Sequence, residues 1–152
     1  MSNGAYMGFG NVQPTPYTPA EDLTGYEGRA MRIVSGNSVG PCSVTSQAAT
    51  QQLAGEGVLI EGGPNEAGIQ VRIVTTGVVR AIAGTGGVTK GANVCPEYAA
   101  SGLDRGRFID RTTAELADQD MVWGRAMSTA TEDGEFDLEL AMRRQPLDGT
   151  GA

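Results

Sequence analysis

The stretch GVVRAIAGTGGVTKGANV, Gly77 to Val94, combines β-branched residues with closely spaced glycines and contains the only lysine of the chain, Lys90. A Walker-type phosphate loop requires Gly-Lys followed by Ser or Thr at the start of a helix. Here the order is Thr89-Lys90-Gly91, and the β-favouring residues Ala-Asn-Val follow. The glycines of GTGG also miss the spacing of a dinucleotide-binding fingerprint. The stretch therefore predicts short strands separated by tight glycine turns.

More short strands are predicted before this stretch. In GIQVRIVTTG the apolar residues Ile69, Val71 and Ile73 alternate with polar ones, which is typical of a half-buried strand. AMRIVSG and GVLIEGG are apolar runs that end in glycine turns. We therefore predict a mostly β fold, a small open β-barrel or sandwich with an extended N-terminal arm and little helix.

A closing β-hairpin is predicted near the C-terminus. MVWGRAMSTA and GEFDLELAM supply its strands, and Asp133-Gly134 in TEDG is a strong hairpin-turn signal. In the second strand, apolar residues alternate with acidic ones, so one face should be buried. The lone tryptophan, in MVWGRAM, is expected to be structural or interfacial and not a ligand platform. The candidate core or trimer-interface residues are Trp123, Phe136, Leu138 and Leu140.

The chain is predicted to comprise an extended arm over residues 1–28, a β-rich domain over residues 29–145 and a flexible tail over residues 146–152. Prolines exclude a regular helix from the arm, yet the arm carries several large side chains. A docking arm and a disordered leader are both compatible with this composition. The candidate contact residues are Tyr6, Met7, Phe9, Pro14, Tyr17 and Tyr26. For residues 42–56 the sequence leaves open a strand followed by a loop or a short helix, and for residues 112–121 it leaves open a helix or a loop.

Composition narrows the class of protein. A chain of 152 residues fits one domain, and 39% hydrophobic residues with 23 glycines predict a modest core that an oligomer interface would assist. The net charge of −7 disfavours nucleic acid and anionic membrane as partners. No apolar run approaches a membrane span, and the first residues do not resemble a secretion signal. We expect synthesis in a cytoplasm, with Cys42 and Cys95 as free thiols.

Catalysis is not expected. The chain has no histidine, which removes the commonest general base and metal ligand. Glu135, Asp137 and Glu139 occupy alternate positions of the predicted last strand, so a solvated strand face explains them without chemistry. We predict no enzyme activity, no cofactor and no metal. A hydrolase or lyase that uses Asp and Glu residues is the alternative from a different class.

Three segments, taken in their order along the chain, resemble a family of tailed-bacteriophage head-decoration, or capsid cement, proteins, related to the trimeric decoration protein of lambda-like heads. The segments are GVVRAIAGTGGVTKGANV, DRGRFIDRTT and DQDMVWGRAMSTATEDGEFDLELAM. The resemblance covers Gly68 to Met142, roughly half of the chain. It implies a virion protein on the outer surface of the capsid. Its implied partners are the major capsid protein and itself, as a homotrimer at local threefold axes. Its implied role is to stabilise the expanded shell against the pressure of packaged DNA. Another virion component, such as a tail or head-completion protein, is the alternative.

Overall fold

The computed structural model describes residues 15–43, 55–97, 99, 101–111 and 121–144. The described residues are mostly β, as the sequence predicts, and contain no α-helix. Gly102–Asp104 forms a 3-10 turn. No helix in this part of the chain has the length and apolar character needed to cross a membrane.

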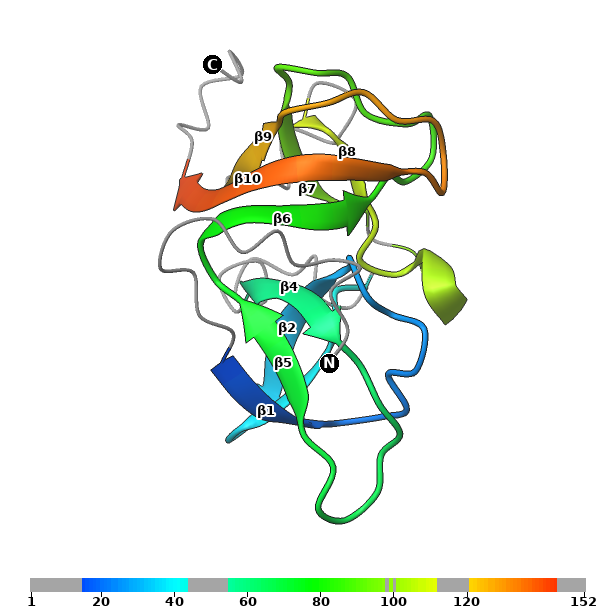
Figure 1. Ribbon diagram of the computed structural model, residues 1–152, viewed down its shortest axis with the longest axis vertical. Coiled ribbons are helices and arrows are strands. Elements are labelled where there is room, and N and C mark those ends of the chain that lie inside the picture. Colours follow the sequence, from blue (N-terminus) through cyan, green and yellow to red (C-terminus); the bar gives the residue numbers. More distant parts are fainter. Residues whose placement is uncertain (1–14, 44–54, 98, 100, 112–120, 145–152) are drawn as a thin grey trace.

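The first five strands form a closed barrel, the lower half of the molecule in Figure 1. They are β1 (Thr15–Pro19), β2 (Ala30–Ser35), β3 (Ser38–Pro41), β4 (Gly55–Glu61) and β5 (Val71–Val74). Their order around the barrel is β1-β3-β2-β4-β5. The barrel is closed, whereas the sequence predicts an open one, because β1 pairs parallel to β3 on one side and antiparallel to β5 on the other.

The remaining strands form a second sheet above the barrel (Figure 1). In spatial order they are β6 (Gly77–Ile82), β10 (Glu135–Arg144), β9 (Met121–Ala126), β7 (Asn93–Pro96) and β8 (Phe108–Asp110). The two outer strands approach each other at one end. There Ala83 forms a parallel bridge with Phe108, and the Gly84 amide donates a 2.6 Å hydrogen bond to the Phe108 carbonyl.

The barrel and the second sheet share apolar packing through the alternation of β4. Val58 and Ile60 point into the core beneath the second sheet, whereas Leu59 between them points into the barrel interior. All three side chains are buried. Both faces of β4 are therefore covered, which explains why GVLIEGG reads as a continuous apolar run.

The Gly77–Val94 stretch forms strands and turns, which confirms its structural interpretation. After β6, the Gly87 amide donates a hydrogen bond to the Gly84 carbonyl and closes a turn. Gly86 and Gly87 adopt positive φ values of 84° and 77°, a backbone region that glycine enters without steric cost. Val88 then pairs with Ala130 in an isolated antiparallel bridge.

The structure places residues 15–28 in the barrel, so the barrel begins before the predicted boundary at residue 28. β1 pairs on both sides, Leu23 is fully buried, and Tyr26 lies in the barrel core. The alternation signal is weak here because β1 is short and rich in proline. Residues 1–14, most of the undecided segments 42–56 and 112–121, and the predicted tail lie outside the described residues.

Candidate functional site

The candidate core residues of the closing hairpin lie inside a single chain. Trp123, Phe136, Leu138 and Leu140 are each at most 2% exposed and belong to the core beneath the second sheet. The Phe108 ring meets Trp123 and Phe136 edge-on, at centroid distances of 6.0 and 6.2 Å. This T-shaped geometry is a preferred one for aromatic pairs. The hairpin face that the sequence marks as apolar is therefore filled by intramolecular packing.

The candidate contact residues that the structure describes are parts of the barrel. The Tyr17 hydroxyl donates a hydrogen bond to the Glu56 carboxylate. Burial, together with this bond and the charge of Glu56, raises the pKa of Tyr17 to about 12. Tyr26 is 7% exposed, so its ring is covered within the chain. Tyr6, Met7, Phe9 and Pro14 lie outside the described residues.

The alternating carboxylates of β10 lie on the outer face of the second sheet. Glu135 and Glu139 are exposed and Asp137 is half-buried. Arg80 on β6 forms ion pairs with Glu135 at 3.4 Å and Asp137 at 3.7 Å. A solvated, charged strand face accounts for these residues, as the sequence indicates.

A second polar region, not expected from the sequence, joins the second sheet to the barrel. It is centred on the turn between β7 and β8, where Gly106 packs directly on the backbone of β2. The Ala30 amide donates a 2.8 Å hydrogen bond to the Gly106 carbonyl. A Cβ at position 106 would lie 2.6 Å from the Ala30 carbonyl oxygen, and φ there is 79°. Glycine is thus required for the close approach of the two sheets.

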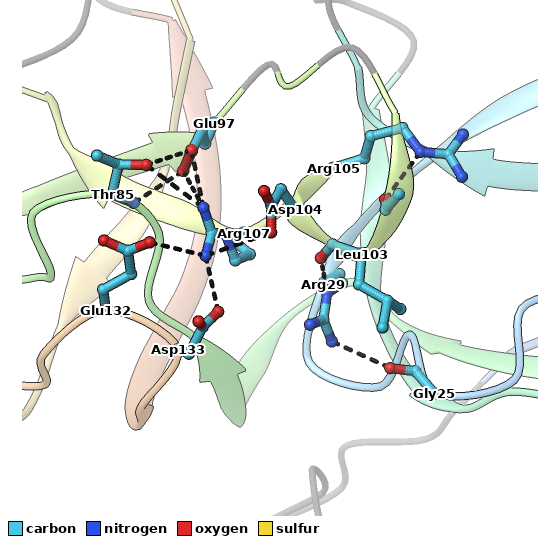
Figure 2. Close-up of polar contacts among 11 residues, drawn as sticks. Gly25, Arg29, Thr85, Glu97, Leu103, Asp104, Arg105, Arg107, Glu132 and Asp133 are labelled. Carbon is cyan, nitrogen blue, oxygen red and sulfur yellow. Dashed lines mark hydrogen bonds and ion pairs between the residues drawn. The ribbon is translucent and has the colours of Figure 1, made fainter.

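Two arginines fix this turn against the barrel. Arg105 forms a bidentate ion pair with Glu21, with N–O distances of 2.6 and 3.2 Å, and donates a 2.6 Å hydrogen bond to the Tyr26 hydroxyl. The Glu21 bonds, and to a lesser degree the Tyr26 bond, raise the pKa of Arg105 despite its partial burial. From the barrel side, Arg29 Nε donates a 2.6 Å bond to the Leu103 carbonyl (Figure 2). Both guanidinium groups lie within 6 Å of the Tyr26 ring centroid, in cation–π range.

Arg107 lies at the centre of a cluster of carboxylates, which we call the Arg107 cluster (Figure 2). Its side chain is only 3% exposed. It contacts Glu97 at 3.1 Å, Asp133 at 2.7 Å, Glu132 at 3.4 Å and Asp104 at 3.5 Å. Glu97 follows β7, Asp104 lies in the turn after it, and Glu132 and Asp133 lie in the loop before β10. One guanidinium therefore links its own turn to a loop that is distant in the chain.

The electrostatics of the Arg107 cluster favour the charged arginine. Burial acts to lower the pKa of Arg107, but the hydrogen bond to Asp133 and the charge of Glu97 outweigh it, and the pKa is raised. Glu97 also accepts hydrogen bonds from the amide and hydroxyl of Thr85, at 2.8 and 2.7 Å. Burial lowers the pKa of Arg29, and the positive charge of the nearby Arg107 lowers it further. The network is suited to holding the turn between β7 and β8 and the loop before β10 together within the second-sheet half of the molecule.

The sequence carried one local signal for this region, the run DRGR, Asp104 to Arg107, which places two arginines around a glycine. Asp104 lies within this run and Glu97 precedes it closely, but Glu132 and Asp133 come from the distant loop before β10, so only the tertiary fold reveals the full cluster. Among the described residues, no group of three or more His, Cys, Asp or Glu side chains is arranged to hold a metal ion. The buried Cys42 and Cys95 thiols are not joined in a disulfide.

Comparison with known proteins gives a match in fold. No protein-family model matches the chain, and no curated protein matches it in sequence. Among solved structures, the N base of the head fibre protein gp8.5 of bacteriophage phi29 is similar, with a TM-score of 0.56 at 15% sequence identity. The match covers 89% of this chain and 98% of that chain. This chain therefore shares the fold of a phage head-fibre base.

Proposed function

We propose that the chain is a structural protein of a bacteriophage head. The observation that carries the proposal is the match in fold to nearly the whole of the phi29 head-fibre base. The order of glycine and strand motifs from Gly68 to Met142, which resembles head-decoration proteins, supports the same class from the sequence.

In its finer form, the proposal is a decoration protein that binds the major capsid protein on the outer surface of the shell. It acts as a homotrimer at local threefold axes and stabilises the expanded shell against packaged DNA. A body whose two sheets are joined by the Arg105–Glu21 ion pair and the Arg29–Leu103 hydrogen bond suits a part that bears load. The net charge of −7 suits an exterior position away from nucleic acid. A non-catalytic role, without cofactor or membrane partner, belongs to the proposal.

The proposal is tested with shells of the virus that encodes the chain, produced with its gene inactivated. Purified full-length protein is mixed with these shells, and bound protein is quantified after sedimentation. We expect saturable binding at many copies per shell, and retention of DNA at temperatures where undecorated shells release it. Binding at a few copies would indicate a tail or head-completion component, and absence of binding would contradict the proposal. Light scattering of the free protein tests for the mass of three chains.

A second candidate function is the base of a head fibre, because the matched structure is the N base of the phi29 head fibre. The two candidates differ in what they do for the shell. A decoration protein raises the temperature at which the shell loses DNA, whereas a fibre base leaves that temperature unchanged. The same comparison of decorated and undecorated shells therefore distinguishes them.

A further inference from the structure

Leu103 is a large apolar side chain that the fold holds outside the core. It lies in the 3-10 turn Gly102–Asp104 and is 49% exposed. A single exposed leucine is ordinary on a protein surface. This one is unusual because its backbone is anchored on both sides. Arg29 donates a 2.6 Å hydrogen bond to its carbonyl, and Arg105 Nε donates a 3.1 Å bond to the carbonyl of Gly102.

This anchoring lowers the entropic cost of using Leu103 in a contact. A flexible loop must be ordered when it binds a partner, which subtracts from the affinity. Here the turn is already fixed to the barrel through Arg29 and to Glu21 through Arg105. The backbone that carries the apolar side chain is therefore held in place before any partner arrives.

The neighbours of Leu103 on the side of the Arg107 cluster are acidic, whereas Arg29 and Arg105 bind the backbone of its turn. Asp104, Glu132 and Asp133 expose 64%, 50% and 67% of their side chains while all three contact Arg107. With Glu97, four carboxylates share the single positive charge of Arg107, so the cluster as a whole is negative. Figure 2 shows Asp104 between Leu103 and this cluster. An apolar side chain thus projects next to exposed negative charge.

We propose that Leu103, Asp104, Glu132 and Asp133 form a docking surface, which we call the Leu103 surface, for a shell protein that offers an apolar pocket bordered by Arg or Lys. The inference rests on the proposed function and adds the place and chemistry of the contact. Charge complementarity favours a basic partner. A second copy of this chain that docks through the same face is disfavoured as the occupant, because it would bring the same exposed carboxylates against them.

The test measures binding of full-length protein to shells that lack it, with Leu103→Ser as the variant. Val34→Ser is the matched control, because Val34 lies in the barrel strand β2 and is 46% exposed. We expect Leu103→Ser to weaken binding at least tenfold and Val34→Ser to change it less than twofold. Thermal unfolding of both variants shows that the fold is kept.

A second pair of variants tests the charge. The double variant Asp104→Asn, Glu132→Gln should bind more weakly at low salt and lose much of the salt dependence. The control Glu135→Gln, Glu139→Gln makes the same charge change on the outer face of β10 and should keep both affinity and salt dependence.

The outcomes separate this inference from the function on which it rests. Wild-type protein that fails to bind shells overturns both. Wild-type protein that binds, together with Leu103→Ser that binds equally well, overturns the Leu103 surface and leaves the proposed function intact. If Leu103→Ser abolishes self-association in light scattering while monomers still bind shells, the occupant is a second copy, and the inference of a basic shell partner is wrong.

Discussion

Removing the side chain of Arg107 should destabilise the protein far more than removing that of Arg80, although both form ion pairs with carboxylates. Arg107 is 3% exposed, whereas Arg80 is 41% exposed. Taking one partner from a fully buried ion pair costs about 3–5 kcal/mol, because the other charge is left without water. Exposed pairs contribute about 0–1 kcal/mol. Both alanine variants remove one positive charge, so the comparison is matched in net charge.

The exposure of the carboxylates refines the estimate for Arg107→Ala. Glu132 and Asp133, at 50% and 67% exposed, can regain water when the guanidinium is lost. Glu97 is only 17% exposed and keeps just its bonds to Thr85. Most of the penalty therefore comes from Glu97 and from lost packing, which places the cost at about 2–4 kcal/mol.

The assay is urea unfolding at pH 7, followed by the fluorescence of the single tryptophan, Trp123, which is 1% exposed in the core beneath the second sheet. Thermal unfolding provides a second measurement of the same loss. For a chain of this size, 1 kcal/mol corresponds to about 2–4 °C in Tm, so Arg107→Ala should lower the Tm by about 4–16 °C. Arg80→Ala should lose less than about 4 °C. Equal losses for the two variants, or a cost below about 1 kcal/mol for Arg107→Ala, would refute the reasoning.

Three further predictions concern the core, the buried thiol and the glycine turn. Leu138→Ala should lower the free energy of unfolding by about 2–5 kcal/mol because Leu138 is fully buried, whereas Glu139→Ala, at an exposed position, should lower it little. Equal shifts in melting temperature would refute the strand register. Burial raises the pKa of Cys95 from 9.0 to about 12. The free energy of unfolding should therefore be unaffected by this thiol below pH 9 and should fall by about 2–3 kcal/mol at pH 11. Cys95→Ala should flatten this alkaline decline in a pH series of urea unfolding curves, and an unchanged slope would contradict the prediction. The new Cβ of Gly86→Ala meets no atom within 4 Å, so this variant should lose only about 1 kcal/mol of stability, from the strain of its positive φ. Gly87→Ala should lose more, because its Cβ would lie 2.5 Å from a backbone carbonyl oxygen. Calorimetry that finds equal losses would show that the turn is not tightly packed.

The second sheet was the part most readable from the sequence, because its signals are local. The alternation in β10 and the Asp133-Gly134 turn identify the closing hairpin without any distant contact, and Asp133 does adopt a positive φ of 64°. The observed connection is longer than the predicted turn, since Val88 pairs with Ala130 inside it. The glycine positions after β6 similarly mark turns by backbone chemistry alone.

The closure of the barrel could not be predicted in the same way. β1 is short and proline-rich, and its pairing with β3 involves only Thr18 and Pro19 on its side. Prolines lack the amide that a strand ladder uses, so local pattern argues against a strand there. Only the neighbouring strands β3 and β5 supply the reason for its conformation. The full Arg107 cluster could not be predicted for a related reason, since Glu132 and Asp133 join it from the distant loop before β10.

The central claim, that this chain is a phage head protein on the outside of the shell, is tested most directly by electron cryomicroscopy of particles with and without it. The difference map should show a body that fits the two-sheet fold at many equivalent positions on the outer surface, grouped in threes at local threefold axes, with the Leu103 surface against a shell subunit. Difference density confined to a single vertex or to the tail, or its absence from the particle, would contradict the account.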